Sequence, residues 1–377
     1  MSEARSLYIH LPFCLHKCHY CDFVVRVLHR PSQIDRYLEH LMLDLQALSA
    51  FAAPLQTVYL GGGTPALLSV TQIQRLAEML QQTFDLRQVQ EWTLEANPEH
   101  LPEAELAAWM QLGVNRISLG VQTFDPLLLA TCGRSHSPAD IAQAVRLIQA
   151  HQLNLSLDLI YGLPDQSLQS WSESLTAALA LQSDHLSLYA LEVHPDTVFG
   201  HRNLPLPEDD ETVAMYELAC ERLTQAGYQH YEIANWSQPG RPSRHNRVYW
   251  QNQPFLAAGV GAHGYFAGRR YAHAASLRAY YLDCQAGLWP WDAAEPQPLS
   301  EAIEETVFLG LRLLIEGLDL RAFERRFQRS LLACYPDVLP RLLKQGHLLL
   351  ADGHLRLSPA AVPVSNGILA EFLEPVL

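Results

Sequence analysis

The chain has 377 residues and a formal net charge of −14, with 49% hydrophobic and 18% charged residues. This length suits one large α/β domain with a smaller appendage, and the apolar content predicts a sizeable core rather than disorder. The acidic balance disfavours a general affinity for nucleic acid or anionic lipid, because both are polyanions. No segment reaches the ~20 apolar residues of a membrane helix, and the N-terminus lacks a signal-peptide pattern, so we expect a cytoplasmic protein.

Strand and helix patterns alternate along the first half of the chain, at intervals of roughly 30 residues. Six apolar or alternating runs predict strands, and the segments between them carry apolar residues three and four apart, which predicts helices. Ser137 followed by Pro138 is favourable chemistry for a helix start. The predicted strands are 6–11, 57–60, 91–96, 115–121, 153–162 and 184–191, and the predicted helices are 34–48, 70–80, 102–113, 137–151 and 168–181.

This alternation predicts a parallel sheet covered by helices. Six repeats favour a partial (β/α)6 barrel over the full eight, and a doubly wound sheet is the alternative that periodicity does not exclude. We expect the barrel to occupy residues 1–240, with a further helix over 207–227 and a strand near 228–233. Residues 241–295 are expected to complete the same core domain, with 241–266 as a long ordered loop.

The second predicted domain is small and follows a proline-dense segment at 289–300. It covers residues 296–377 and resembles a winged-helix-like α+β domain, with a hairpin turned at Asp352-Gly353. Three arginines on one of its helices, Arg325, Arg326 and Arg329, favour a solvated face over contact with nucleic acid. The predicted helices are 300–314, 319–328, 335–345 and 363–373, and the predicted hairpin is 347–357.

Three of the seven cysteines, Cys14, Cys18 and Cys21, lie together directly after the first predicted strand. Cysteines stay reduced in the cytosol, so clustered ones indicate metal rather than disulfides. Thiolates suit either iron–sulfur clusters or zinc. Three thiols would leave one iron of a four-iron cluster open to a small chelating ligand, whereas a structural zinc site completed by a nearby histidine is the alternative.

Glycines and polar residues follow the other predicted strands, and a parallel barrel brings these strand ends to one rim. Glycines let the backbone approach a ligand closely, carboxylates accept hydrogen bonds from ribose hydroxyls, and an arginine can pair with a carboxylate. Each feature alone is more often a turn or a helix cap, so their shared location is the stronger indication of a binding site. The residues are Gly61, Gly62, Gly63, Thr64, Glu95, Asn97, Gln122, Arg134, Asp158 and Tyr189.

The C-x-x-x-C-x-x-C spacing of Cys14, Cys18 and Cys21, with the aromatic Tyr20 before the third cysteine, resembles the signature of the radical S-adenosylmethionine superfamily. The resemblance implies a partial barrel, a [4Fe-4S] cluster held by the three cysteines, and S-adenosylmethionine chelated by the open iron. The sequence is similar to the subfamily of oxygen-independent coproporphyrinogen dehydrogenase and its relatives. By this resemblance the residues that bind S-adenosylmethionine are Tyr8, Tyr20, Gly62, Gly63, Thr64, Glu95, Gln122, Arg134 and Asp158.

Two features distinguish between members of this subfamily. The dehydrogenase carries a further cysteine two residues after the third, where this chain has Phe23. The segment 245–250, HNRVYW, resembles the H-N-x-x-Y-W motif of the HemW family of heme chaperones, and 259–265 resembles that family's glycine-rich stretch. Neutral histidine is a good iron ligand, and aromatic rings offer flat surface to a porphyrin. The heme candidates are His245, Asn246, Tyr249 and Trp250, with His263 as another candidate ligand.

The same residues also have a purely structural interpretation, in which His245 and Asn246 tie down a loop while Tyr249 and Trp250 pack in the core. The resemblance implies a heme chaperone that carries heme to respiratory or other hemoproteins, at the cytoplasmic membrane surface, with a homodimer as an option and no nucleic-acid partner. The alternative is an oxygen-independent coproporphyrinogen III dehydrogenase or another radical enzyme acting on a tetrapyrrole, such as a heme methyltransferase. Phe23 and the H-N-x-x-Y-W segment favour the chaperone.

Overall fold

The computed structural model describes residues 3–202 and 204–376 of the chain. Residues 1, 2, 203 and 377, which the expected ranges 1–240 and 296–377 include, lie outside the described residues. Within the described part, no helix is long and apolar enough to cross a lipid bilayer.

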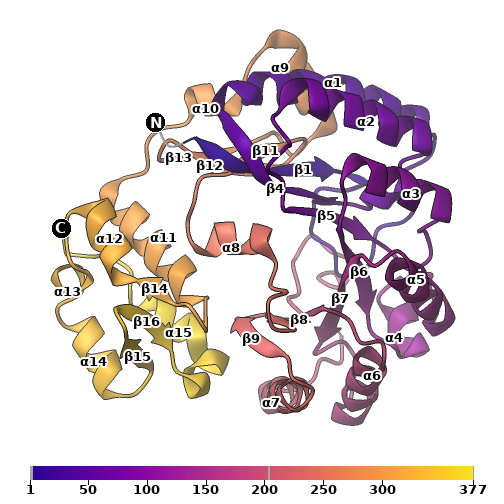
Figure 1. Ribbon diagram of the computed structural model, residues 1–377. Helices are drawn as coiled ribbons and strands as arrows, with labels where there is room; N and C mark the ends of the chain where they lie inside the picture. The colour runs from indigo at the N-terminus through magenta and orange to yellow at the C-terminus, as the bar shows by residue number, and fades with distance from the viewer. Residues whose placement is uncertain (1–2, 203, 377) are drawn as a thin grey trace.

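Six parallel strands form the centre of the molecule, and each pairs with the next one along the chain (Figure 1). A doubly wound sheet reverses its strand order at a switch point, whereas this order does not reverse. The predicted partial barrel of six repeats is therefore confirmed. The strands are β1 (Ala4–Leu11), β4 (Ala52–Gly62), β5 (Glu91–Ala96), β6 (Arg116–Gln122), β7 (Asn154–Tyr161) and β8 (His185–Ala190).

Helices cover the outer face of this curved sheet (Figure 1). Alternate strand residues such as Leu119 and Leu157 are fully buried between sheet and helices, which is the packing that apolar alternation predicts. Ser137 accepts a hydrogen bond from the Asp140 amide, so the predicted cap begins α5. The helices are α1 (Ser32–Leu48), α2 (Val70–Thr83), α3 (Glu103–Leu112), α4 (Pro126–Thr131), α5 (Pro138–Ala150), α6 (Leu168–Ala180) and α7 (Asp209–Gln225).

Short elements extend the sheet to nine strands, in the order β11-β1-β4-β5-β6-β7-β8-β10-β9. β11 (Leu256–Ala258) pairs in parallel with β1, while β10 (Asn235–Ser237) and β9 (Gln229–Glu232) are antiparallel additions at the other edge. The segment expected as a loop over 241–266 instead contains β11 and α8 (Arg244–Trp250), which lies inside the curve of the sheet (Figure 1). Elements this short carry too few residues to show a period.

β12 (His263–Phe266) and β13 (Arg269–Ala272) form a two-stranded ribbon after β11, followed by α9 (Leu277–Ala286) and α10 (Pro290–Ala293). The ribbon packs against the barrel through buried aromatic rings, Phe266 and Tyr271 among them. This stretch therefore belongs to the same hydrophobic core as the barrel strands.

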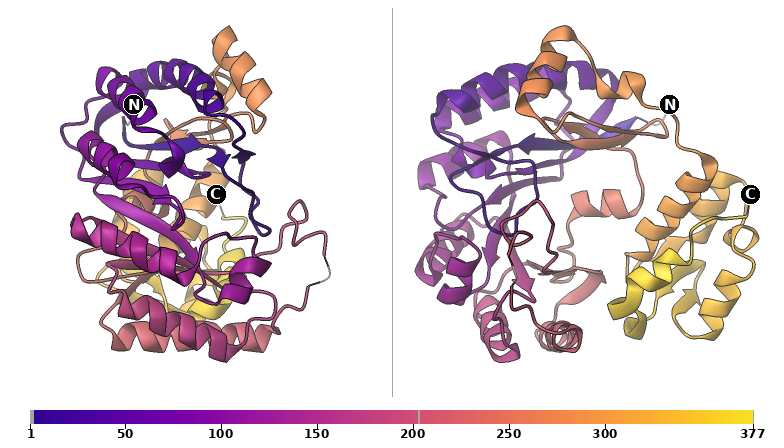
Figure 2. Two further views of the ribbon diagram at one scale, coloured as in Figure 1. Left: turned by 90° about the vertical axis from the view of Figure 1, so that its right-hand side faces the viewer. Right: turned by 180° about the vertical axis from the view of Figure 1, so that it is seen from behind.

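The last part of the chain has a separate hydrophobic core, which includes Ile303, Leu342 and Phe372. Its elements lie beside the open side of the curved sheet (Figure 2). The predicted hairpin is present, and both turn residues, Asp352 and Gly353, have the positive φ that a tight hairpin turn requires. The elements are α11 (Leu299–Leu311), β14 (Leu318–Asp319), α12 (Leu320–Phe327), α13 (Leu331–Cys334), α14 (Val338–Lys344), β15 (Leu348–Ala351), β16 (His354–Leu357) and α15 (Ser365–Ala370).

Candidate functional site

The inner face of the barrel is polar, and it lines a cavity of about 330 Å³ that we call the cluster cavity. Alternate residues of each strand point inward, so the polar residues recur with a period of two between the apolar residues that face the helices. Because the cavity lies at the carboxyl ends of parallel strands, it occupies the usual position of a barrel active site. Its inward-facing strand residues include Thr93 and Glu95, Arg116, Ser118 and Gln122, Ser156 and Asp158, and His185, Ser187 and Tyr189.

The cysteine loop forms one wall of the cluster cavity. Cys14 lies in β2 (Phe13–Cys14), which pairs with β3 (Arg26–Val27), and all three thiols line the cavity and are partly buried. Burial raises the pKa of the Cys14 thiol to about 11, so its thiolate form requires a stabilising positive charge or hydrogen-bond donor nearby.

The three thiols all line the cluster cavity. Among the described residues, no three histidine, cysteine, aspartate or glutamate side chains are placed to hold one metal ion. A structural zinc site needs such convergence, whereas the cysteines of a cubane each bind a different iron. Three cysteine donors fit a four-iron cluster that keeps one iron open.

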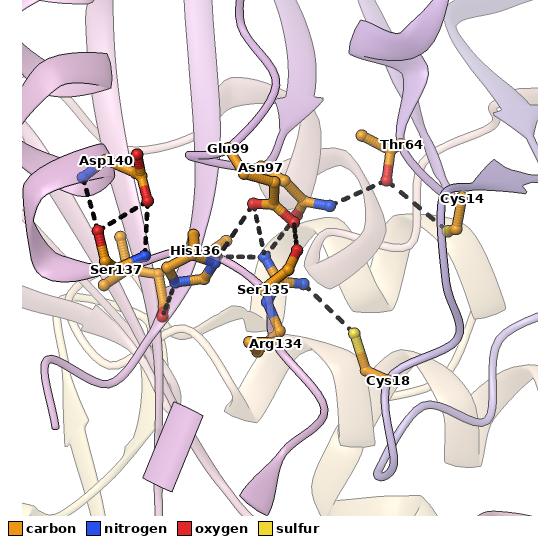
Figure 3. A network of polar contacts seen from close by, with 12 residues as sticks. Cys14, Cys18, Thr64, Asn97, Glu99, Arg134, Ser135, His136, Ser137 and Asp140 are labelled. Carbon is orange, nitrogen blue, oxygen red and sulfur yellow. Dashed lines mark hydrogen bonds and ion pairs between the residues drawn. The ribbon is translucent and has the colours of Figure 1, made fainter. Parts of the chain in front are cut away.

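A chain of polar contacts connects two of the thiols across the cavity (Figure 3). Thr64 Oγ1 lies 3.7 Å from Cys14 Sγ and accepts a hydrogen bond from Asn97 Nδ2 at 3.0 Å. Arg134 Nη2 donates to Asn97 Oδ1 at 2.8 Å, and Arg134 Nη1 lies 3.4 Å from Cys18 Sγ. A guanidinium is a charge-assisted donor, so its place beside the Cys18 sulfur suits an anionic cluster.

Arg134 is itself held from behind (Figure 3). Its guanidinium donates to the Gly120 carbonyl at 2.9 Å and lies 3.9 Å from Glu99 Oε2, which in turn lies 3.3 Å from His136 Nδ1. Burial opposes ionisation of Glu99, but the hydrogen bond with His136 and the charge of Arg134 outweigh it and hold the pKa of Glu99 at about 2. Glu99 is thus an anionic support for the guanidinium.

Glu95 connects the second strand end to the third. It accepts hydrogen bonds from Tyr59 Oη at 2.8 Å and from the Gly62 amide at 2.9 Å. Burial in the barrel raises the pKa of Glu95 to about 7. The carboxyl group is therefore positioned before any ligand arrives, and a ligand donor or cation beside it would favour its ionised form.

The glycine run allows two segments of backbone to approach each other closely. A Cβ atom on Gly63 would lie 2.6 Å from the Phe13 carbonyl oxygen, and the neighbouring Thr64 amide donates to that same oxygen at 2.7 Å. Any larger residue at position 63 would push the cysteine loop away from β4. The run is thus required for the position of Cys14, which follows Phe13.

Two polar atoms in the cluster cavity have no partner among the described residues. They are Arg134 Nε and Thr93 Oγ1, and both are buried. Buried polar atoms are normally hydrogen-bonded, so these two are available to a polar ligand. This is the feature expected of a cavity that holds a small polar cofactor.

The structure brings most of the predicted cofactor residues together. Tyr20, Gly62, Gly63, Thr64, Glu95, Gln122, Arg134 and Asp158 all line the cluster cavity. Tyr8 does not: its hydroxyl group contacts His10 Nδ1 at 3.0 Å, and it lines a neighbouring cavity instead.

The floor of the barrel was missed by sequence reasoning. Arg116, Ser118, Ser156, His185 and Ser187 line the cluster cavity, and Ser118 donates to Asp158 at 2.7 Å. Burial raises the pKa of Asp158, whereas hydrogen bonds from serine side chains such as Ser118 act to lower it. The signal was present in the sequence as polar residues at every second position of buried strands.

The neighbouring cavity has a volume of about 620 Å³ and lies between the barrel and α11; we call it the aromatic cavity. It adjoins the cluster cavity, because Asp22, Phe23, Gly62 and Glu95 line both. Its walls include Phe23, Tyr249, Trp250, Phe255, His263, Arg270, Glu305 and Leu309.

The H-N-x-x-Y-W segment lies in α8, and its side chains lie in three places: the aromatic cavity, the cluster cavity and the protein interior. Tyr249 and Trp250 line the aromatic cavity and Asn246 lines the cluster cavity. His245 is fully buried and lines neither. Its Nδ1 lies 2.8 Å from Thr57 Oγ1 and its Nε2 lies 2.8 Å from Tyr249 Oη, so heme ligation by His245 requires one of these hydrogen bonds to break.

Comparison with known proteins places this geometry in a superfamily. Residues 8–178 match the radical SAM superfamily, and residues 297–364 match the HemN C-terminal domain. Coproporphyrinogen III oxidase (HemN) from Escherichia coli, described as a radical SAM enzyme, has the same fold, with a TM-score of 0.86 over 98% of this chain and 90% of that one. At 22% identity this likeness concerns the fold alone. The fold and the matches define a radical SAM protein.

The sequence relatives are closer. The chain is 35% identical to the heme chaperone HemW of Lactococcus lactis, covering 99% of this chain and 98% of that protein. It is 34% identical to HemW of Bacillus subtilis, covering 98% and 99%. The chain therefore belongs to the HemW family of heme chaperones, and the resemblance recognised in the sequence is confirmed.

Proposed function

We propose that this chain is a heme chaperone, which takes up heme as cargo and delivers it to respiratory or other hemoproteins. The observation that supports this best is the likeness to chaperones of the HemW family along nearly the whole chain. A second observation agrees with it. Phe23 stands where the coproporphyrinogen dehydrogenase has a further cysteine.

We further propose that Cys14, Cys18 and Cys21 hold a [4Fe-4S] cluster and that the cluster cavity holds S-adenosylmethionine. A bound cluster supplies a one-electron redox centre and an open iron for a chelating ligand. The protein's own part is to place the ligands. Arg134 holds Cys18 and Asn97, while Glu95 and Asp158 present carboxyl groups to a polar ligand. Tyr8 lines the aromatic cavity, so its proposed effect on the cofactor is indirect. It acts through Glu95 and Gly62, which line both cavities.

The proposal also includes the partners. The acceptors are hemoproteins, including those at the cytoplasmic surface of the membrane, and the chaperone works from the cytoplasm, with a homodimer as an option. The net charge of −14 supports contact with the acceptor protein rather than with anionic lipid, because like charges repel.

A transfer experiment tests the function. The cluster is reconstituted without oxygen, the protein is loaded with hemin, and a heme-free hemoprotein is added while the visible spectrum is followed. We expect stoichiometric loading, then transfer to the acceptor that is faster than spontaneous uptake of free hemin. No binding of hemin, or transfer no faster than from serum albumin loaded to the same level, would contradict the proposal.

The enzymatic alternative is tested with the same preparation. Coproporphyrinogen III, S-adenosylmethionine and a reductant are added, and the tetrapyrroles are separated by chromatography. We expect neither protoporphyrinogen nor a methylated or ring-opened tetrapyrrole. Formation of any of these at catalytic amounts would replace the chaperone with a radical enzyme.

A further inference from the structure

The aromatic cavity has the wall chemistry of a site for a large flat ligand. Tyr249 and Phe255 meet edge to face, with ring centroids 4.6 Å apart, and Trp250 and Phe23 also line the cavity. Phe23 is 61% exposed, so its ring offers apolar surface to a ligand at this cavity. The volume of about 620 Å³ falls within the roughly 300–1,000 Å³ of pockets that bury small ligands.

The indole of Trp250 brings an unsatisfied polar atom to these walls. The indole Nε1 of Trp250 is buried and has no hydrogen-bond partner among the described residues. A buried donor without a partner is destabilising, and a ligand acceptor would relieve that cost. The walls are therefore apolar but contain a donor that is available to a ligand.

Two of the three histidines near this cavity already have both ring nitrogens occupied. His10 contacts Tyr8 Oη through Nδ1 and the Val24 carbonyl through Nε2, at 3.0 and 2.7 Å. His245 lies behind Tyr249, is fully buried and is likewise hydrogen-bonded at both nitrogens. Neither imidazole can bind a metal without losing an existing contact.

The third histidine, His263, is free. It begins β12, lines the aromatic cavity and has an exposed side chain. Across residues 3–202 and 204–376, the structure gives its imidazole no hydrogen-bond partner. Its backbone is fixed by the pairing of β12 with β13, where His263 stands opposite Ala272. An exposed imidazole on a fixed strand is well placed to ligate iron.

We propose that the aromatic cavity is the heme site and that His263 supplies the axial ligand to the iron, an inference that rests on the proposed function. The porphyrin lies against Tyr249 and Trp250, and Phe23 separates it from the cluster cavity. Arg270 is the only lysine or arginine among the described residues that line the cavity. Its Nε pairs with Glu305 and its Nη2 donates to Asn252, so it meets a heme carboxylate through its remaining guanidinium nitrogen. His245 has a positioning role, because it holds Tyr249 through the Nε2 contact.

The test is a hemin titration of the full-length protein with its cluster reconstituted, followed by absorbance and by electron paramagnetic resonance. His263→Ala is expected to weaken hemin binding about tenfold or more and to change the spin state of the iron. His263→Met keeps a ligand but replaces imidazole with thioether, so we expect retained binding with a shifted Soret band. Because His263 is exposed, both variants should unfold at the wild-type temperature.

His354→Ala is the matched control, since His354 lies in the C-terminal hairpin outside this cavity, and it should leave both signals unchanged. Wild-type affinity and spectrum in His263→Ala and His263→Met would overturn the assignment of His263 while leaving the proposed function intact. A wild-type protein that binds no hemin would instead overturn the proposed function. The two failures are thus distinguishable.

Discussion

The two adjoining cavities differ in how the polar groups of their walls are connected to one another. In the cluster cavity, hydrogen bonds link Thr64, Asn97 and Arg134 between two thiols, and Glu99 supports Arg134 from behind. In the aromatic cavity, the His263 imidazole and the Trp250 indole belong to no such network within residues 3–202 and 204–376. A paired network suits a resident group whose ligands must be held in place, whereas open donors suit a cargo that enters and leaves.

Loss of a cluster ligand should have the largest effect and should be confined to one cavity. In Cys18→Ser, we expect iron and sulfide to fall from about four per chain to near zero, because a hydroxyl is a poor ligand for iron in a cubane. Hemin affinity should change by less than about threefold, since the two sites lie in different cavities. Metal analysis and hemin titration measure both quantities, with Cys220→Ser as the control. An equal loss of hemin binding would show that the cavities are not separate.

Removing the guanidinium that supports the cluster should destabilise the fold itself. Arg134→Gln leaves Glu99 and the Gly120 carbonyl without their cationic partner in a site where the arginine side chain is 4% exposed. Breaking a buried charge pair on one side costs about 3–5 kcal/mol. Urea unfolding of the cluster-free protein measures this, and Arg146→Gln, an exposed position on α5, is the control. A loss below 1 kcal/mol would mean that water replaces the guanidinium at little cost.

The buried histidine of α8 should make the fold sensitive to acid. Burial lowers the pKa of His245 from 6.5 to about 3, so the unfolded chain takes up a proton on this group first and stability falls as the pH falls from 6.5 towards 3. Between pH 6.5 and pH 4.5 this group contributes a loss of about 2–3 kcal/mol. His245→Gln should remove that part of the slope. The free energy of unfolding of the wild type and of His245→Gln is measured at several pH values. An equal loss of stability in both proteins as the pH falls would mean that His245 is charged in the native protein.

The smallest effect is expected at the rim of the aromatic cavity. Arg270 Nε lies 2.8 Å from Glu305 Oε1, and about a third of each side chain is exposed. Glu305→Gln should cost less than about 1 kcal/mol in stability, because solvent screens the pair. It should also tighten hemin binding about twofold by freeing Arg270 for a heme carboxylate. Glu301→Gln, at an exposed position on the same helix, is the control, and weaker hemin binding in Glu305→Gln would exclude Arg270 from the site.

Much of the fold followed from local sequence. The six long strands have periods that a short window detects, and the cap at Ser137 begins α5 as predicted. β11 escaped detection because its three residues, Leu256 to Ala258, are all buried and show no alternation. Its place in the sheet depends on β1, about 250 residues earlier in the chain. The division into residues 1–240, 241–295 and 296–377 stays a prediction.

The candidate site divides in the same way. The cysteine spacing and the strand-end residues lie within short stretches of sequence, and the structure gathers them in one cavity, although their roles stay predictions. The His245 ring is enclosed partly by its contact with Thr57, which is 188 positions away in the sequence. No local sequence pattern could therefore show that this ring is buried. The free ring of His263 likewise becomes evident only when its neighbours are placed in space.

The position of β11 at the sheet edge also has a consequence for synthesis. β1 emerges from the ribosome first, but the strand that covers its outer edge follows only at residues 256–258. At the usual rate of translation, this edge stays uncovered for roughly 12–50 s. A nascent chain interrupted before residue 256 would present an unpaired strand directly beside the cysteine loop, and such edges promote aggregation.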